Sequence, residues 1–449
     1  MRHEGITALE LAKHLTKSLW GLADKALPVV YGIGYVYLVI RVLPEEEFGN
    51  FVLLQEVFLI VSSLAAALAL QPLLKFAAED TKDTGEIITI SLLLNFFFVL
   101  LASGALVLLR HPLSAMMNAP TLAPLFLQLP ALMAASFIRN FALILLQSRF
   151  LIGRVFWVDA VHFLGAPVLV WVYSRMHLFN SAMDLVNITI VSLSASSLLA
   201  LILTWSLFRW NVHPTVQEFR RVSNYGLFSL GGVLSYVVYS KADTFILSAF
   251  TGPAQVAVYT SAKIFTRIFD MSTQIIQMFI LPGASLLVSR GDHSNLKTVV
   301  EKSLLFSTIG MLPIMIPLIL FSGPLINLIY GGRYPDAVLI LQVFGLMALT
   351  IPAFAIGSNV LMGIGEARAS FVLGIQTLIV SVAAYSVAIP WLGALGAAIG
   401  VVLSSFVMAG LALKLVKLHV PFTLREVLLR WKDILMFVRS RGRRILKHS

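Results

Sequence analysis

The chain has 449 residues, of which 58% are hydrophobic and only 12% are charged, with a formal net charge of +11. This composition excludes an ordinary soluble globular protein and indicates a polytopic membrane protein. The chain has no cysteine, which excludes disulfides, thiolate metal sites and thiol catalysis. No His or acidic cluster has the spacing of metal ligands, so we expect neither a metal nor another cofactor.

Apolar windows of about 20 residues, long enough to cross a bilayer, recur along the chain. They follow a polar leader, residues 1–17, and predict an all-α protein with twelve transmembrane helices. The expected spans are residues 18–43, 48–70, 86–109, 120–147, 155–175, 183–207, 225–250, 254–287, 303–330, 335–362, 367–389 and 393–417.

Basic residues are distributed unevenly between the two sets of loops. An even number of spans places both termini on one side, and the segments on that side hold most of the Lys and Arg residues. This asymmetry follows the positive-inside rule, so we expect both termini to be cytoplasmic. The basic excess then serves topology, and nucleic acid is not an expected partner.

The chain also contains an internal repeat. LFLQLPALMA at 125–134 matches LILQVFGLMA at 339–348, and shorter matches before and after it keep nearly the same offset. We interpret the repeat as two pseudo-symmetric six-helix bundles around a central cavity, residues 18–207 and 225–417. A cytoplasmic linker, 208–224, joins them.

A basic amphipathic tail, residues 418–449, follows the last expected span. Its apolar residues recur at helical spacing and are flanked by Lys and Arg. We expect this cytoplasmic tail to lie on the anionic inner leaflet, the alternative being a solvated tail with no role beyond anchoring.

Charged residues interrupt two neighbouring spans in the second half. Lys241 and Asp243 lie on the first of them, and Lys263, Arg267 and Asp270 lie on the second. Ionisable groups within a span cost about 2.5–3.5 kcal/mol each, so they normally face a bundle interior or a wet cavity. An internal ion pair of Arg267 with Asp270 or Asp243, and a Lys263 that extends toward the surface, are the alternatives.

The first half carries intramembrane charges as well. Arg139 lies deep in its span, and we interpret it as a cavity residue. Asp24 and Lys25 lie near the start of the first span, where an interfacial position is the alternative. Asp159 and His162 are three residues apart, so they form either a proton-responsive pair or a satisfied contact in the core.

Three segments of the chain resemble a known family. They are RVLPEEEFGNF at 41–51, KADTFILSAFTGPAQVAVYTSAKIF at 241–265 and IYGGRYPDAVLILQVFGL at 329–346. They are similar to the polysaccharide exporter and O-antigen flippase family, within the multidrug/oligosaccharidyl-lipid/polysaccharide exporter superfamily. This resemblance covers about residues 15–417. It implies a flippase, not an enzyme, that moves polyprenyl-pyrophosphate-linked oligosaccharide between the leaflets of a bacterial inner membrane by alternating access.

Such a substrate requires cations in the cavity, because Lys and Arg replace water around phosphate oxygens. The expected substrate-binding cations are Arg139, Lys241, Lys263, Arg267 and Lys25. The expected charge partners or ion-coupling groups are Asp24, Asp159, His162, Asp243 and Asp270. Besides the glycan, the expected partners are membrane lipids, a coupling proton or sodium ion, and polysaccharide assembly proteins.

Other function classes stay open. A multidrug/cation antiporter of the same fold would favour intramembrane carboxylates, whereas the charge balance here leans toward an anionic substrate. A membrane polysaccharide polymerase or ligase would need a large outer loop with catalytic residues, and every loop is short. A non-catalytic assembly partner is a third alternative.

Overall fold

The computed structural model describes residues 20, 23–24, 26–28, 31–32, 34–35, 37–78, 84–208 and 214–433. These residues are predominantly helical and none of them lies in a strand, which confirms the all-helical fold class. Lys25 and the tail beyond residue 433 lie outside the described residues. The prediction that Lys25 contacts substrate is therefore not tested.

The chain divides into two compact units, Met1–Ala257 and Val258–Ser449. The long helices of the first unit are α2 (Glu45–Ala65), α4 (Thr84–Leu108), α7 (Leu129–Ser148), α8 (Ile152–Arg175), α9 (Ala182–Thr204) and α10 (Val216–Thr251). Shorter elements extend or connect them: η1 (Ala66–Leu70), α3 (Gln71–Ala78), α5 (Arg110–Met116), η2 (Pro120–Leu122), α6 (Ala123–Phe126) and η3 (Trp205–Leu207).

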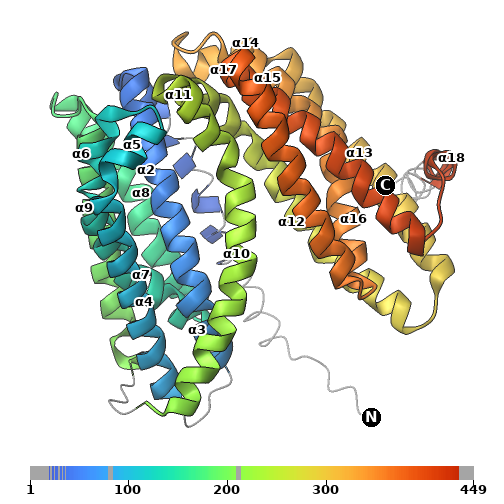
Figure 1. Cartoon of the computed structure of the whole chain (residues 1–449), viewed down its shortest axis with the longest axis horizontal. Helices are drawn as coiled ribbons and strands as arrows, with labels where there is room; N and C mark the ends of the chain where they lie inside the picture. Colours follow the sequence, from blue (N-terminus) through green and yellow to red (C-terminus); the bar gives the residue numbers. More distant parts are fainter. Residues whose placement is uncertain are drawn as a thin grey trace, which may run out of the picture. The chain divides into compact units, whose positions relative to one another are not determined.

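Within the first unit, α9 packs against both α7 and α8, and these helices run side by side in Figure 1. Helix α10 packs on α2, η1, α3 and α4, so its contacts group it with the first unit. Gly226 of α10 permits this approach, because a Cβ there would collide with the backbone oxygen of Leu68 in the π-helical turn η1. The linker predicted at 208–224 separates the two six-helix bundles that the internal repeat indicates, and it stays a prediction.

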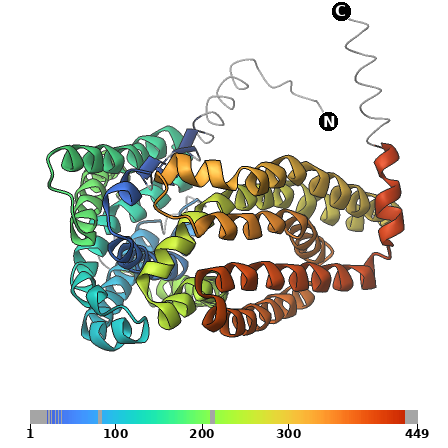
Figure 2. The same ribbon diagram turned by 90° about the horizontal axis from the view of Figure 1, so that it is seen from above.

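The second unit contains the remaining helices. After α11 (Pro253–Lys263), which begins in the first unit, they are η4 (Ile264–Thr266), α12 (Arg267–Ser289), α13 (His293–Leu320), α14 (Ser322–Tyr330), α15 (Ala337–Gly345), η5 (Leu346–Leu349), α16 (Ile351–Gly363), α17 (Ala367–His419) and α18 (Leu424–Leu429). Helix α16 packs between α12 and α17 around an apolar core that includes Ile356, Val360 and Ala412. Figure 2 shows α18, in red, lying crosswise at the ends of the long helices of this unit.

Among the described residues, eight helices are long and apolar enough to cross a membrane, or nine if the bent pair Ala337–Leu349 and Ile351–Gly363 forms one span. The protein is therefore a multi-pass membrane protein. The count of twelve spans stays a prediction, since residues 18–43 are described only in part and α10 is not among the eight. Helix α17 has 53 residues and breaks at Gly393, whose φ is 53°, between the two spans expected at 367–389 and 393–417.

Candidate functional site

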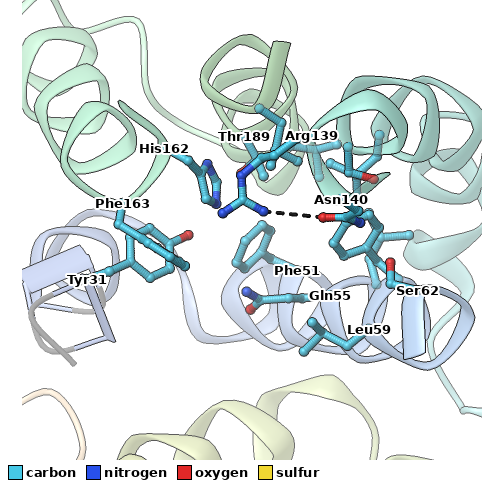
Figure 3. Close-up of a pocket in the computed structure, with 16 residues that line it drawn as sticks. Tyr31, Phe51, Gln55, Leu59, Ser62, Arg139, Asn140, His162, Phe163 and Thr189 are labelled. Carbon is cyan, nitrogen blue, oxygen red and sulfur yellow. Dashed lines mark hydrogen bonds between the residues drawn. The ribbon is translucent and has the colours of Figure 1, made fainter. Parts of the chain in front are cut away.

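The first unit contains a pocket of about 220 Å³, lined by α2, α7, α8, α9 and the segment around Tyr31 (Figure 3). Its lining combines aromatic rings with polar side chains. The aromatic residues are Tyr31, Phe51, Phe58 and Phe163. The polar residues are Gln55, Ser62, Ser136, Arg139, Asn140, His162 and Thr189. Two of the sequence-predicted residues, Arg139 and His162, thus meet at one pocket.

Arg139 is the charged side chain that lines this pocket. It lies on α7, is only 8% exposed, and forms an ion pair through its Nη2 atom with Asp159 of α8. Its Nε–H donates to Ser196 Oγ of α9 at 3.1 Å, and its Nη1–H donates to Asn140 Oδ1 at 3.3 Å. A guanidinium has five N–H donors, so one N–H on each terminal nitrogen is not used by these contacts. Figure 3 shows the guanidinium between His162 and Asn140, directed into the pocket.

Serines on α9 hold the polar groups in place. Ser196 Oγ accepts from Arg139 and donates to the carbonyl oxygen of Val158 at 2.5 Å. One turn earlier, Ser192 Oγ lies 2.9 Å from His162 Nδ1. Small hydroxyl residues on one face let neighbouring helices approach closely and hydrogen-bond across the interface. The Arg139 and His162 side chains are therefore fixed in position by the same helix.

A second carboxylate lies near the Arg139–Asp159 pair. Asp24 is buried, and its Oδ1 atom has no hydrogen-bond partner among the described residues. Asp24 is close enough to Arg139 to interact with it electrostatically. One guanidinium thus interacts electrostatically with two carboxylates.

The other predicted charges of the first unit lie on α10. Lys241 Nζ lies 2.5 Å from Glu56 Oε2 of α2, an ion pair between two helices far apart in sequence. Asp243 is buried and accepts hydrogen bonds from the backbone N–H and the hydroxyl of Thr244, at 2.7 and 3.2 Å. Lys241 therefore has a charge partner in the protein, and its contact with substrate stays a prediction.

The predicted charges of the second unit lie on either side of a helix break. The 3₁₀ turn η4 separates Lys263, at the end of α11, from Arg267, at the start of α12. Lys263 is half-buried, with Nζ 5.2 Å from the centroid of the Tyr259 ring, whereas Arg267 and Asp270 are exposed. The expectation that these groups and Arg139 line one central cavity stays a prediction.

Several residues of the site were not predicted from the sequence. The serines are the clearest case, because SLSASS at 192–197 places Ser192 and Ser196 one helical turn apart. A search for small hydroxyl residues at that spacing would have found them. Glu56 lies within the span expected at 48–70, but nothing in its local spacing indicates its pairing with Lys241. Asn140 and Gln55 carry no sequence signal of their own.

The chain is similar to a protein of Haloferax volcanii named as a probable low-salt glycan biosynthesis flippase. The two are 23% identical over 243 residues, which is 53% of this chain and 50% of the relative. The chain spans half or less of the length of the curated relatives that it matches.

Two solved structures share the fold. An inward-facing multidrug resistance transporter of the MATE family, in the MOP superfamily, has a TM-score of 0.72 and 18% identity, over 89% of this chain and 98% of that one. The lipid II flippase MurJ in an inward closed conformation has a TM-score of 0.72 and 11% identity, over 92% of this chain and 89% of that one.

A match to a family as a whole covers more of the chain. Residues 38–339 match the polysaccharide biosynthesis protein family, and that segment is more than half of the chain. This protein therefore belongs to the polysaccharide biosynthesis protein family.

Proposed function

We propose that the protein is a flippase that moves polyprenyl-pyrophosphate-linked oligosaccharide, a polysaccharide or O-antigen repeat unit, across the inner membrane. In this proposal two six-helix halves alternate access, and both termini are cytoplasmic. Family membership, the glycan flippase relative and the fold shared with a lipid II flippase support it. The observation that carries it is the buried Arg139 guanidinium, with N–H groups left over, in a pocket of a membrane-spanning unit.

The chemistry of the pocket suits part of such a substrate. Phosphate oxygens and sugar hydroxyls can accept hydrogen bonds from the N–H groups that Arg139 does not use. Asn140 and Gln55 offer further amide donors and acceptors. Aromatic rings such as Phe51 and Phe163 provide flat apolar faces for a sugar ring. At about 220 Å³ the pocket is smaller than the roughly 300–1,000 Å³ of drug-sized sites, so it would receive one group rather than the whole glycan.

The pyrophosphate requires more positive charge than Arg139 provides. We assign that role to Lys241, Lys263, Arg267 and Lys25, with Asp243 and Asp270 as their charge partners. The position of Lys241 supports this assignment. Its ammonium group is paired with Glu56, and it could exchange the carboxylate oxygen for a phosphate oxygen without losing a charge partner. Polysaccharide assembly proteins are the partners expected to receive the translocated unit.

The carboxylates beside Arg139 provide a site for a coupling ion. We propose that Asp24 and Asp159 take up a proton or a sodium ion, because Asp24 is buried and its Oδ1 atom accepts no hydrogen bond from a described residue. His162, held by Ser192, lies at the same pocket and completes the titratable set. Ion binding would weaken the hold of Asp159 on Arg139 and so free the guanidinium for substrate.

A multidrug/cation antiporter is the second candidate. The buried Asp24 carboxylate favours it, because a cationic drug would be attracted to the same two acids that would bind a coupling ion. The two candidates differ in the charge of the transported molecule. A flippase moves an anion, and an antiporter moves a cation.

Reconstituted protein tests the proposal directly. Liposomes carrying undecaprenyl pyrophosphate linked to N-acetylglucosamine should expose the sugar of inner-leaflet lipid to an external lectin only when the protein is present. Arg139→Ala should slow this exposure at least tenfold. The matched control is Arg154→Ala, which removes an exposed arginine of α8 that contacts the Leu203 carbonyl instead of the pocket.

Two outcomes would contradict the proposal. Transport that is unchanged by Arg139→Ala would remove the pocket from the mechanism. Ion-driven export of a cationic dye with no movement of the lipid-linked sugar would replace the flippase with the antiporter.

A further inference from the structure

The segment that follows α17 carries a second, unrelated set of charges. This tail segment, residues 424–433, consists of α18, a turn at Arg430 and a last helical turn. It begins at a capping box, in which Thr423 and Glu426 satisfy each other's backbone N–H groups. Val427 packs into the apolar core of the second unit together with Val420 and Phe422. The tail segment is thus a folded part of that unit.

One face of the tail segment is fastened to α13 by ion pairs, which we call the ionic clasp. It joins Glu426, Arg430 and Asp433 of the tail segment to Lys297, Glu301 and Lys302 of α13. Lys297 Nζ lies 2.6 Å from Glu426 Oε1, and Lys302 Nζ lies 3.0 Å from Asp433 Oδ2. The three tail residues are spaced i, i+4 and i+7, so they share one helical face.

The carboxylate at the centre of the ionic clasp is buried, whereas its partner Arg430 is half-buried. Glu301 is only 1% exposed, and its Oε2 atom accepts from Arg430 Nε at 2.8 Å and Nη2 at 2.7 Å. Arg430 Nη2 also donates to Thr298 Oγ1 at 3.3 Å. A buried carboxylate that loses its partner is strongly destabilising, so the tail segment has one preferred docking face.

The opposite face of the tail segment is apolar and exposed. Leu424, Leu428 and Trp431 are 71%, 55% and 50% exposed, and they too are spaced i, i+4 and i+7. This stripe is offset by two residues from the ionic clasp, which on an α-helix is more than half a turn. The exposed cations Arg425 and Lys432 flank it.

The place of the tail segment in the fold indicates what covers this stripe. Only residues 420–423 separate α18 from α17, which crosses the membrane as one of the long apolar helices. Figure 2 shows α18 lying across the ends of the helices of the second unit. A helix tied to the end of a span, with an apolar stripe bordered by cations, lies at the depth of the lipid headgroups.

We propose that the tail segment is an interfacial anchor whose outer face binds anionic phospholipid, while the ionic clasp holds its inner face on α13. Leu424, Leu428 and Trp431 enter the boundary of the acyl chains, and Arg425 and Lys432 pair with headgroup phosphates. The charge asymmetry of the loops makes this the cytoplasmic leaflet. The inference does not depend on which molecule the protein transports.

The absence of cysteine from the sequence allows a clean test. A spin label is attached to Leu428→Cys in protein reconstituted into nanodiscs of phosphatidylcholine with or without phosphatidylglycerol. Its collision rate with oxygen dissolved in lipid should exceed that with an aqueous nickel chelate at least threefold. The matched control is Ser294→Cys, an exposed polar position in the first turn of α13, where the aqueous reagent should dominate.

Two further variants separate the parts of the proposal. Arg425→Glu with Lys432→Glu should remove the increase in lipid contact that phosphatidylglycerol produces. Arg430→Ala should release the tail segment from α13 and make the label at 428 more mobile. A label at 428 as accessible to the aqueous chelate as the label at 294 would overturn the proposal. So would a label shielded from both reagents, because that would place a second protein surface on the stripe.

Discussion

Two arginine–carboxylate centres in the described part of the chain each include a buried residue, Arg139 in one and Glu301 in the other, and they differ in what surrounds them. In the first unit, Arg139 binds Asp159, Ser196 and Asn140 and still has N–H donors that face a pocket. In the second unit, Arg430 places Nε and Nη2 on Glu301, so its donors are directed at protein. Burial of an ion pair does not by itself mark a functional site. The Arg139 centre is the candidate site because it combines unused N–H donors with an adjacent pocket.

The Arg139 centre should show the largest effects. Arg139→Ala takes the guanidinium away from the half-buried Asp159 and the buried Asp24, which should cost about 3–5 kcal/mol of stability as well as transport. Replacing both partners, as in Arg139→Met with Asp159→Leu, should recover part of the thermal stability, because Asp159 is no longer a carboxylate that has lost Arg139, whereas Asp24 still is. Transport should stay lost. Thermal unfolding in detergent and lectin-detected flipping measure the two effects, and recovery of both by the double variant would make Arg139 purely structural.

The Glu301–Arg430 centre should show the opposite pattern. Arg430→Ala removes the hydrogen bonds that the buried Glu301 accepts and leaves it only Lys297, 3.7 Å away, so the stability of the second unit should fall by about 1–3 kcal/mol. Transport per folded molecule should change less than twofold, since Arg430 lies at no pocket that we assign to substrate. Flipping assays normalised to folded protein test this. A loss as large as that of Arg139→Ala would erase the distinction between the two centres.

Close helix packing in the first unit gives a smaller effect with an internal control. Gly226→Ala would place a methyl group against the Leu68 carbonyl, so α10 must shift and the stability should fall by about 1–3 kcal/mol. Gly232→Ala lies on the same helix with nothing within 4 Å and should raise stability by up to about 1 kcal/mol. The melting temperatures of the two variants should therefore move in opposite directions. Equal shifts would show that α10 does not depend on this contact.

Hydropathy predicted the helices well, because each apolar run must be helical to satisfy its backbone in lipid. The span expected at 86–109 is α4, Thr84–Leu108, and the one expected at 155–175 is α8, Ile152–Arg175. The pairing of charges was not predictable in the same way. Lys241 pairs with Glu56, and Arg139 pairs with Asp159, across helix–helix contacts that the local spacing of residues does not indicate.

The tail segment shows the same division between helix and contact. The amphipathic pattern predicted a helix, but its ion pairs with α13 were not predicted, because Glu301 lies 129 residues before Arg430 in the chain. Periodicity therefore predicts which residues share a face. Tertiary packing decides which of those faces meets another helix, and with it which charges are left for substrate.

The smallest predicted effect is the response of the ionic clasp to acid. Hydrogen bonds, first from Lys297 and then from Thr423, lower the pKa of Glu426 from 4.5 to about 2. A depressed pKa means that the contribution of Glu426 to docking is complete above its ordinary pKa and is lost as the pH falls from 4.5 toward 2. The charged groups that share this contact are Lys297, Glu301, Lys302, Arg430 and Asp433.

A spin label at position 428 should therefore become more mobile across that acidic range, and the change should be modest because Glu426 is exposed to solvent. Glu426→Gln should be mobile to a similar degree at neutral pH and should lose the part of the response that comes from this carboxylate. Any response that remains in Glu426→Gln belongs to Glu301 or Asp433, the other acids of the ionic clasp. An identical pH profile in the two proteins would mean that the ion pair between Lys297 and Glu426 does not contribute to docking. The Glu301–Arg430 centre would then hold the tail segment on α13 without it.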